Sequence, residues 1–92
     1  MKNPYKFPLI AVTWADAIAE CGWHNIEEIT RETLVSSVGW LIRDDKYSLA
    51  LAGTIGTNEG APETVNQIMV IPAGMVVARE VLLEAGPEDD NG

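Results

Sequence analysis

Residues Leu34–Ile55 read LVSSVGWLIRDDKYSLALAGTI, and this stretch decides the fold. Two apolar runs, Leu34–Arg43 and Tyr47–Ile55, flank the short charged segment Asp44–Lys46. Alternating apolar residues on both sides of a charged turn predict a β-hairpin. In the second run, the side chains expected to face the core are Tyr47, Leu49 and Leu51.

The flanking sequence continues this β-rich pattern. Leu9–Trp14 precedes the hairpin and Asn66–Ile71 follows it, and a sharp turn at Pro72–Gly74, with the character of one 3₁₀ turn, leads into Met75–Leu83. Five short strands with a tight turn before the last strand are the layout of Sm-like and Src-homology-3-like barrels. We therefore predict a mainly β fold, a small five-stranded barrel.

A segment with helix signals separates the first strand from the hairpin. Asn25 and Glu28 have the spacing of a capping box. We predict one or two helical turns over Asp16–Cys21 and a short helix from Ile26 to about Glu32. These elements would form a helical insertion after the first strand.

Length and charge limit the classes of protein. The chain has 92 residues and a net charge of −8, from 14 acidic and 6 basic residues. We expect one domain over residues 1–85 and a disordered acidic tail over residues 86–92. The charge argues against duplex nucleic acid as a partner. A single cysteine and the lack of an apolar run of about 20 residues indicate a cytoplasmic protein without a membrane segment.

Five short segments carry a resemblance: Val12–Ala17, Gly22–Trp23, Val35–Ile42, Leu49–Ala52 and Met69–Gly74. They resemble small accessory proteins of bacteriophages and prophages. The resemblance implies a phage origin, no known enzymatic activity and a place in the cytosol of a bacterial host. It also implies a role against host defence, either as a sponge for nucleotide immune signals or as a blocker of a host protein.

Aromatic residues near the insertion form one candidate ligand site. Trp14 and Trp23 could stack on a base while Asp16 and His24 form hydrogen bonds to its edge. The alternative is structural: tryptophan is mostly buried, and Asp16 would then cap a helical turn.

Cationic residues form a second candidate site. Arg43 and Lys46 flank the hairpin turn and could hold the phosphates of a small nucleotide, although Asp44 and Asp45 could instead neutralise them. Arg79 lies on an otherwise apolar face of the last strand, so it lines a cavity, pairs with an acid or sits at an interface. The complete set of expected ligand-binding residues is Trp14, Asp16, Trp23, His24, Trp40, Arg43, Tyr47 and Arg79.

Catalytic and metal sites are not expected. Cys21 and His24 lack a third orienting group, and one cysteine with one histidine does not fill a zinc site. Glu27–Glu28 and Asp44–Asp45 are adjacent pairs, which do not form a general acid–base dyad. We therefore expect no enzyme and no cofactor.

Several strands are apolar or small on both faces, which a chain of this length cannot bury alone. We therefore expect a homo-oligomer. The predicted function is that of a non-catalytic phage-type protein that sequesters a small nucleotide-derived host immune signal. The alternative is an acidic interaction protein that inhibits a host protein by occupying a basic surface.

Overall fold

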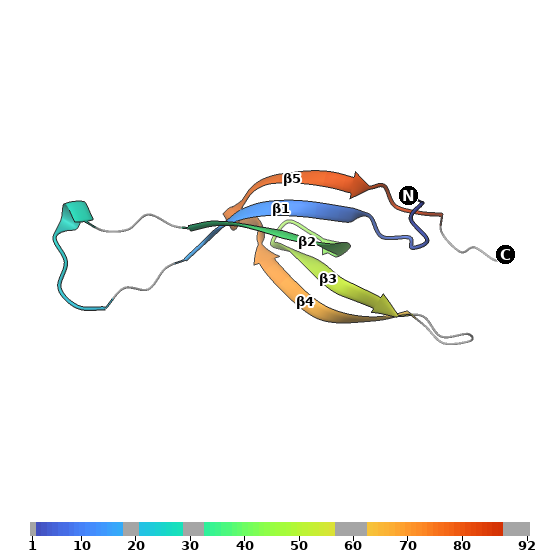
Figure 1. Cartoon of the computed structure of the whole chain (residues 1–92), viewed down its shortest axis with the longest axis horizontal. Helices are drawn as coiled ribbons and strands as arrows, with labels where there is room; N and C mark the ends of the chain where they lie inside the picture. The colour runs from blue at the N-terminus through green and yellow to red at the C-terminus, as the bar shows by residue number, and fades with distance from the viewer. Residues whose placement is uncertain (1, 18–20, 29–32, 57–62, 88–92) are drawn as a thin grey trace.

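A five-stranded antiparallel sheet forms the body of the protein (Figure 1). The computed structural model describes residues 2–17, 21–28, 33–56 and 63–87. The sheet order is β4-β3-β2-β1-β5. The mainly β fold predicted from the sequence is confirmed. The strands are β1 (Leu9–Asp16), β2 (Thr33–Asp44), β3 (Ser48–Gly56), β4 (Thr64–Pro72) and β5 (Val76–Leu83).

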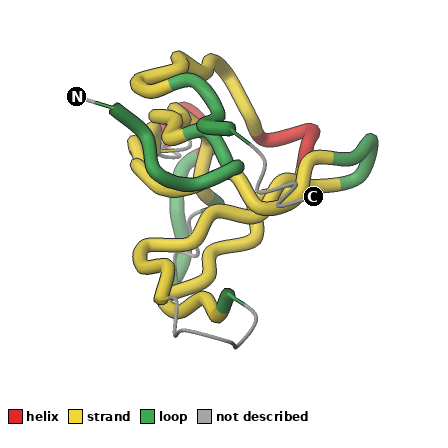
Figure 2. Tube along the Cα trace, turned by 90° about the vertical axis from the view of Figure 1, so that its right-hand side faces the viewer, coloured by secondary structure: helices red, strands yellow, loops and turns green. Residues whose placement is uncertain are grey.

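The sheet curls (Figure 2) but does not close into the predicted barrel. β4 and β5 form its two edges, and the 3₁₀ turn η2 (Ala73–Met75) joins them, as the sequence indicated. Both edge strands are irregular. β5 has an extra residue relative to β1 at Val77 and again at Leu82, and Gln67 of β4 has a φ of 59°. These interruptions oppose the continuous ladder that barrel closure needs.

The insertion after β1 differs from the predicted helices. Within the described residues 21–28, the only helical element is the 3₁₀ turn η1 (Ile26–Glu28). β1 continues to Asp16, while residues 18–20 and 29–32 lie outside the described residues. Ile26 is 84% exposed. A helical turn that packs no apolar side chain lacks the tertiary contacts that stabilise short helices in proteins.

A small apolar cluster on the inner, concave face of the sheet forms the core. Leu49 and Leu51 belong to it, which confirms two of the three predicted core positions of β3. Tyr47 does not, because it lies in the turn before β3 and is 73% exposed. Trp14, Leu41 and Val76 pack against the cluster, whose buried members are Ile10, Val12, Leu49, Leu51 and Ile71.

A β-bulge at Ile42 changes which side chains of β2 face the core. Leu41 is paired with Leu51, but the next pair is Arg43 with Ala50, so Ile42 is an extra residue. Residues that lie directly opposite each other share a face of the sheet. Because the bulge shifts the alternation by one, Asp44 lies opposite Leu49 and faces the core side.

The chain is extended for its length. Its radius of gyration is 17.3 Å, whereas a compact domain of this size has about 12 Å. Figure 1 shows why: the outer ends of β1 and β2 project as a two-stranded arm, opposite the end that holds the termini. β5 pairs with β1 only as far as Trp14, and β3 pairs with β2 only from Trp40. Much apolar surface therefore stays exposed.

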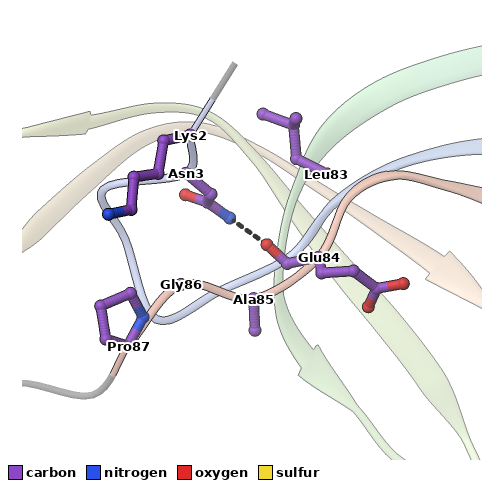
Figure 3. Close-up of a pocket in the computed structure, with 7 residues that line it drawn as sticks. All are labelled: Lys2, Asn3, Leu83, Glu84, Ala85, Gly86 and Pro87. Atoms are coloured by element: carbon purple, nitrogen blue, oxygen red, sulfur yellow. Dashed lines mark hydrogen bonds between the residues drawn. The ribbon is translucent and has the colours of Figure 1, made fainter.

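The N-terminal arm is fastened to the segment after β5 (Figure 3). Asn3, only 6% exposed, donates from Nδ2 to the carbonyl oxygens of Phe7 and Glu84, both at 2.8 Å. Its Oδ1 accepts a hydrogen bond from the backbone N–H of Tyr5 at 2.9 Å. Gly86 N–H donates to the Tyr5 carbonyl at 2.7 Å. Gly86, the first residue of the predicted tail, is thus bound to the folded body, while residues 88–92 lie outside the described residues.

Candidate ligand site at the β2–β3 turn

A pocket of about 240 Å³ lies beside the β2–β3 turn. Lys46 and Arg79 line it, and Arg43 contacts it through Ser48, whose hydroxyl oxygen accepts a hydrogen bond from Arg43 Nη2 at 3.0 Å. The turn, the start of β3, η2 and β5 all contribute to this pocket. The lining residues are Asp44, Asp45, Lys46, Ser48, Leu49, Ala73, Val76 and Arg79.

Arg79 pairs with Asp44, one of the three roles that the sequence left open for it. Arg79 Nη1 donates to Asp44 Oδ2 at 2.9 Å, and both side chains are about half exposed. Arg79 lies opposite the core residue Val12, and the bulge at Ile42 brings Asp44 to the same face. The neighbouring Glu80 lies opposite Ala11 on the other face, so it is not the partner.

Arg43 has a looser acidic neighbour. Its Nε lies 3.8 Å from Asp45 Oδ2. Asp45 Oδ1 accepts hydrogen bonds from the backbone N–H groups of Tyr47 at 2.8 Å and Ser48 at 3.0 Å. The bonds from Ser48 and Tyr47, and the charge of Arg43 to a lesser extent, hold the pKa of Asp45 below its ordinary value of 3.8. The main interactions of Asp45 are therefore its hydrogen bonds to the backbone of the turn. Its ion pair with Arg43 is exposed and weak.

Lys46 lines the pocket, and the ring of its neighbour Tyr47 lies beside it. Lys46 Nζ lies 5.0 Å from the centroid of the Tyr47 ring. The ring is otherwise open to solvent, so one of its faces can accept a stacked base. Of the eight expected ligand-binding residues, Arg79 lines this pocket, while Arg43 and Tyr47 contact its lining residues Ser48 and Lys46.

Trp14 belongs to the core instead. It packs against the apolar cluster, and its Nε1 donates to Ser37 Oγ at 3.1 Å. Trp14 lies opposite Val35, eight residues before Arg43 on β2. At about 3.3 Å per residue, the separation along the strand is roughly 26 Å. Trp14 and Arg43 of one copy therefore cannot hold the same small ligand.

Trp40 and Asp16 are also remote from the turn pocket. The Trp40 ring packs edge-on against Tyr5 of the N-terminal arm, with centroids 5.0 Å apart and an interplanar angle of 76°. Asp16 lies opposite Thr33, at the outer end of the β1–β2 arm, and is exposed. Neither side chain lines the pocket.

Trp23 and His24 belong to the insertion between β1 and β2. Figure 1 shows this insertion at the far end of the molecule from the termini. Trp23 is fully exposed. His24 Nε2 donates to the Cys21 carbonyl at 2.9 Å. This bond requires the proton on Nε2, so the hydrogen bond places Nε2 on the Cys21 backbone rather than on its thiol.

Two features of the structure were missed by the sequence reasoning. Ser48 orients Arg43, and its only signal is a hydroxyl directly after a charged turn. Asn3 is the single buried polar residue of the described part, and nothing in the local sequence distinguishes it from an ordinary turn residue. A second pocket of about 300 Å³ lies beside it (Figure 3), lined by Lys2, Asn3, Leu83, Glu84, Ala85, Gly86 and Pro87.

Within the described ranges, no three His, Cys, Asp or Glu side chains lie close enough to hold a metal ion. In the same part of the chain, no helix has the length and apolar character needed to cross a membrane.

Comparison of the chain with protein-family models, with curated proteins and with solved structures finds no match. The resemblance to phage and prophage accessory proteins stays a prediction from the sequence.

Proposed function

We propose that this chain is a non-catalytic binding protein that acts as a homo-oligomer and sequesters a small nucleotide-type anion at the β2–β3 turn. One observation carries the proposal. In a protein with a net charge of −8, two of the six basic residues line a single pocket, and a third donates a hydrogen bond to the lining residue Ser48. Clustered cations in an acidic protein attract a compact anion locally while the rest of the surface repels a long polyanion. The three residues are Arg43, Lys46 and Arg79.

The arrangement suits phosphate groups beside an aromatic ring. A phosphate can replace Asp44 as the partner of Arg79, because a half-exposed ion pair contributes little stability. About 240 Å³ is small for a whole ligand. We therefore place the phosphates in the pocket and the base outside it, stacked on Tyr47. Such binding involves no bond making or breaking.

The biological role rests on the sequence resemblance. Small phage proteins that hold a nucleotide signal lower its free concentration, and tight binding by a preformed site is sufficient for that task. We therefore propose a nucleotide-derived signal of host defence as the ligand.

Calorimetry against a panel of cyclic and linear nucleotides tests this proposal. We expect at least one nucleotide to bind, and Arg79→Ala to weaken it at least about tenfold, the effect of one lost charge-assisted hydrogen bond. Lys6→Ala is the matched control. It removes the same charge from a side chain whose Nζ lies over the Phe7 ring, outside the pocket. Flat traces for the whole panel, or equal losses in both variants, would contradict the proposal.

A second function is favoured by the placement of the acidic residues. Every carboxylate in the described part is exposed, which suits an inhibitor that covers a basic surface. These residues are Asp16, Glu27, Glu28, Asp44, Asp45, Glu63, Glu80 and Glu84.

Truncation after Pro87 tests this second function. It removes three tail acids, Glu88, Asp89 and Asp90, and keeps Gly86, which is bound to Tyr5. The acidic-inhibitor function predicts elution from a poly-lysine matrix at lower salt, whereas nucleotide binding stays unchanged. Elution at the same salt concentration would count against a role for the tail.

A further inference from the structure

β4 is an edge strand without the charged side chains that usually protect such an edge. The segment Thr64–Pro72 contains no charged residue, although 22% of the chain is charged. It lies at one end of the sheet, and in the described part its only partner is β3. Natural edge strands normally carry charges or bulges that prevent pairing with another chain. The exposed apolar side chains of β4 are Val65, Ile68, Met69 and Val70.

β5, the opposite edge, has both kinds of protection. The extra residues Val77 and Leu82 break its regular hydrogen-bonding pattern at two places. Arg79 and Glu80 also place two charged side chains in the middle of the strand. A second chain therefore cannot form a continuous, uncharged ladder on β5.

We propose that β4 pairs antiparallel with β4 of a second copy, around a two-fold axis near Met69. Two copies that each carry a net charge of −8 repel each other, so contact is favoured where no charge is present. Of the two edge strands of the described sheet, β4 and β5, only β4 combines an open edge with an uncharged sequence. Pairing of β4 with the same strand of a second copy places like edges together, and like edges are related by a two-fold axis. The inference rests on the oligomer in the proposed function and names its surface.

The ends of the pairing segment are marked by two residues. Gln67, with its positive φ, interrupts the regular strand at one end. Pro72, which has no N–H to donate, limits the ladder at the other end. Four regular residues remain between them, Ile68–Ile71. With the axis at Met69, Ile68–Val70 pair with the same three residues of the second copy.

The proposed pairing also covers apolar side chains on the outer face. With the axis at Met69, Ile68 lies opposite Val70 of the partner subunit. In one copy, Ile68 lies opposite the buried Ala52, and Val70 lies opposite the buried Ala50. Small side chains on β3 beside larger exposed ones on β4 thus form an apolar surface that continues into the second copy.

Light scattering after size exclusion tests the inference. We expect the wild-type chain to have twice the 10.0 kDa mass of one chain. Val70→Lys should raise the dimer dissociation constant at least about tenfold, because two lysines would enter a neutral contact. The matched control is Val77→Lys on β5. The two valines are 53% and 60% exposed, so the same substitution at Val77 should leave the dimer intact. Ile68→Lys serves as a second variant if Val70→Lys does not fold by circular dichroism.

Two outcomes would overturn the inference. One is a wild-type monomer at micromolar concentration. The other is an assembly that Val70→Lys and Val77→Lys weaken equally, because contact between unlike edges would then be indicated. Calorimetry separates this result from the proposed function: a monomer that binds a nucleotide keeps the ligand site, and a dimer without nucleotide binding keeps the β4 contact.

Discussion

Asn3→Asp is expected to destabilise the protein by about 2–4 kcal/mol, although it changes one atom of the side chain. Asn3 Nδ2 donates two hydrogen bonds, to the carbonyls of Phe7 and Glu84. A carboxylate in this place would face two carbonyl oxygens without a proton to donate. Each buried polar group that loses its partner costs about 1–3 kcal/mol, and the repulsion adds to that cost. The hydrogen bond to Glu84 also joins the N-terminal arm to the segment after β5, so its loss should loosen both segments.

Urea unfolding at one fixed protein concentration measures this effect. Asn3→Ala removes the same donors without adding a charge, so it should be destabilising but less so than Asn3→Asp at neutral pH. The difference between the two should shrink in acid, where a protonated carboxyl can donate one hydrogen bond. Asn25→Asp is the control, because Asn25 is exposed and forms only a long, 3.4 Å hydrogen bond to Glu28. Equal stability of Asn3→Asp and Asn25→Asp would show that the hydrogen bonds of Asn3 to Phe7 and Glu84 contribute little to stability.

Local signals in the sequence were sufficient for the strands and the hairpin turn. Alternating apolar residues, the charged turn and the Pro-Ala-Gly segment each depend on residues within one or two positions of each other. They predicted the strands and the 3₁₀ turn before β5 to within a few residues. The insertion was harder, since an isolated capping pattern does not form a helix without an apolar surface to pack against.

Bulges account for most of what the sequence did not reveal. Strict alternation puts Arg43 on the face of Leu41, but the extra residue Ile42 reverses that order and turns Asp44 toward Arg79. A bulge depends on the register between two strands, which is a tertiary property. The open edges have the same origin, because the extra residues Val77 and Leu82 are visible only once β5 is aligned with β1.

The candidate site also combines residues that local sequence signals identified with residues whose positions depend on the tertiary structure. The cations that flank the hairpin turn were found because they are neighbours in the sequence, and Arg79 stood out as a charge among apolar residues. The tryptophans were grouped by residue type, and residue type does not encode distance. Trp14 packs on the core and Trp40 on Tyr5, so their aromatic surface stabilises the fold in one copy.

Ile71→Ala is expected to cost about 2–5 kcal/mol, the range for removing a buried aliphatic side chain. Ile71 is completely buried and is one of the five buried members of the core cluster in the described part of the chain. It anchors the edge strand β4 through its pair with Leu49 on β3. A domain of this size has a total stability of only about 5–14 kcal/mol. The variant should therefore lose a large share of its stability and loosen β4 first.

Val38→Ala provides the matched comparison for Ile71→Ala. Val38 is also a β-branched residue of a strand, but it is exposed on β2 and does not line the turn pocket. Its truncation should cost less than about 1 kcal/mol, mainly through reduced β-propensity. Thermal unfolding and amide hydrogen exchange measure both variants, with faster exchange in β4 expected only for Ile71→Ala. If the two variants unfold at the same temperature, the small core cannot be what holds β4 in place, and contacts with another copy must supply that stability.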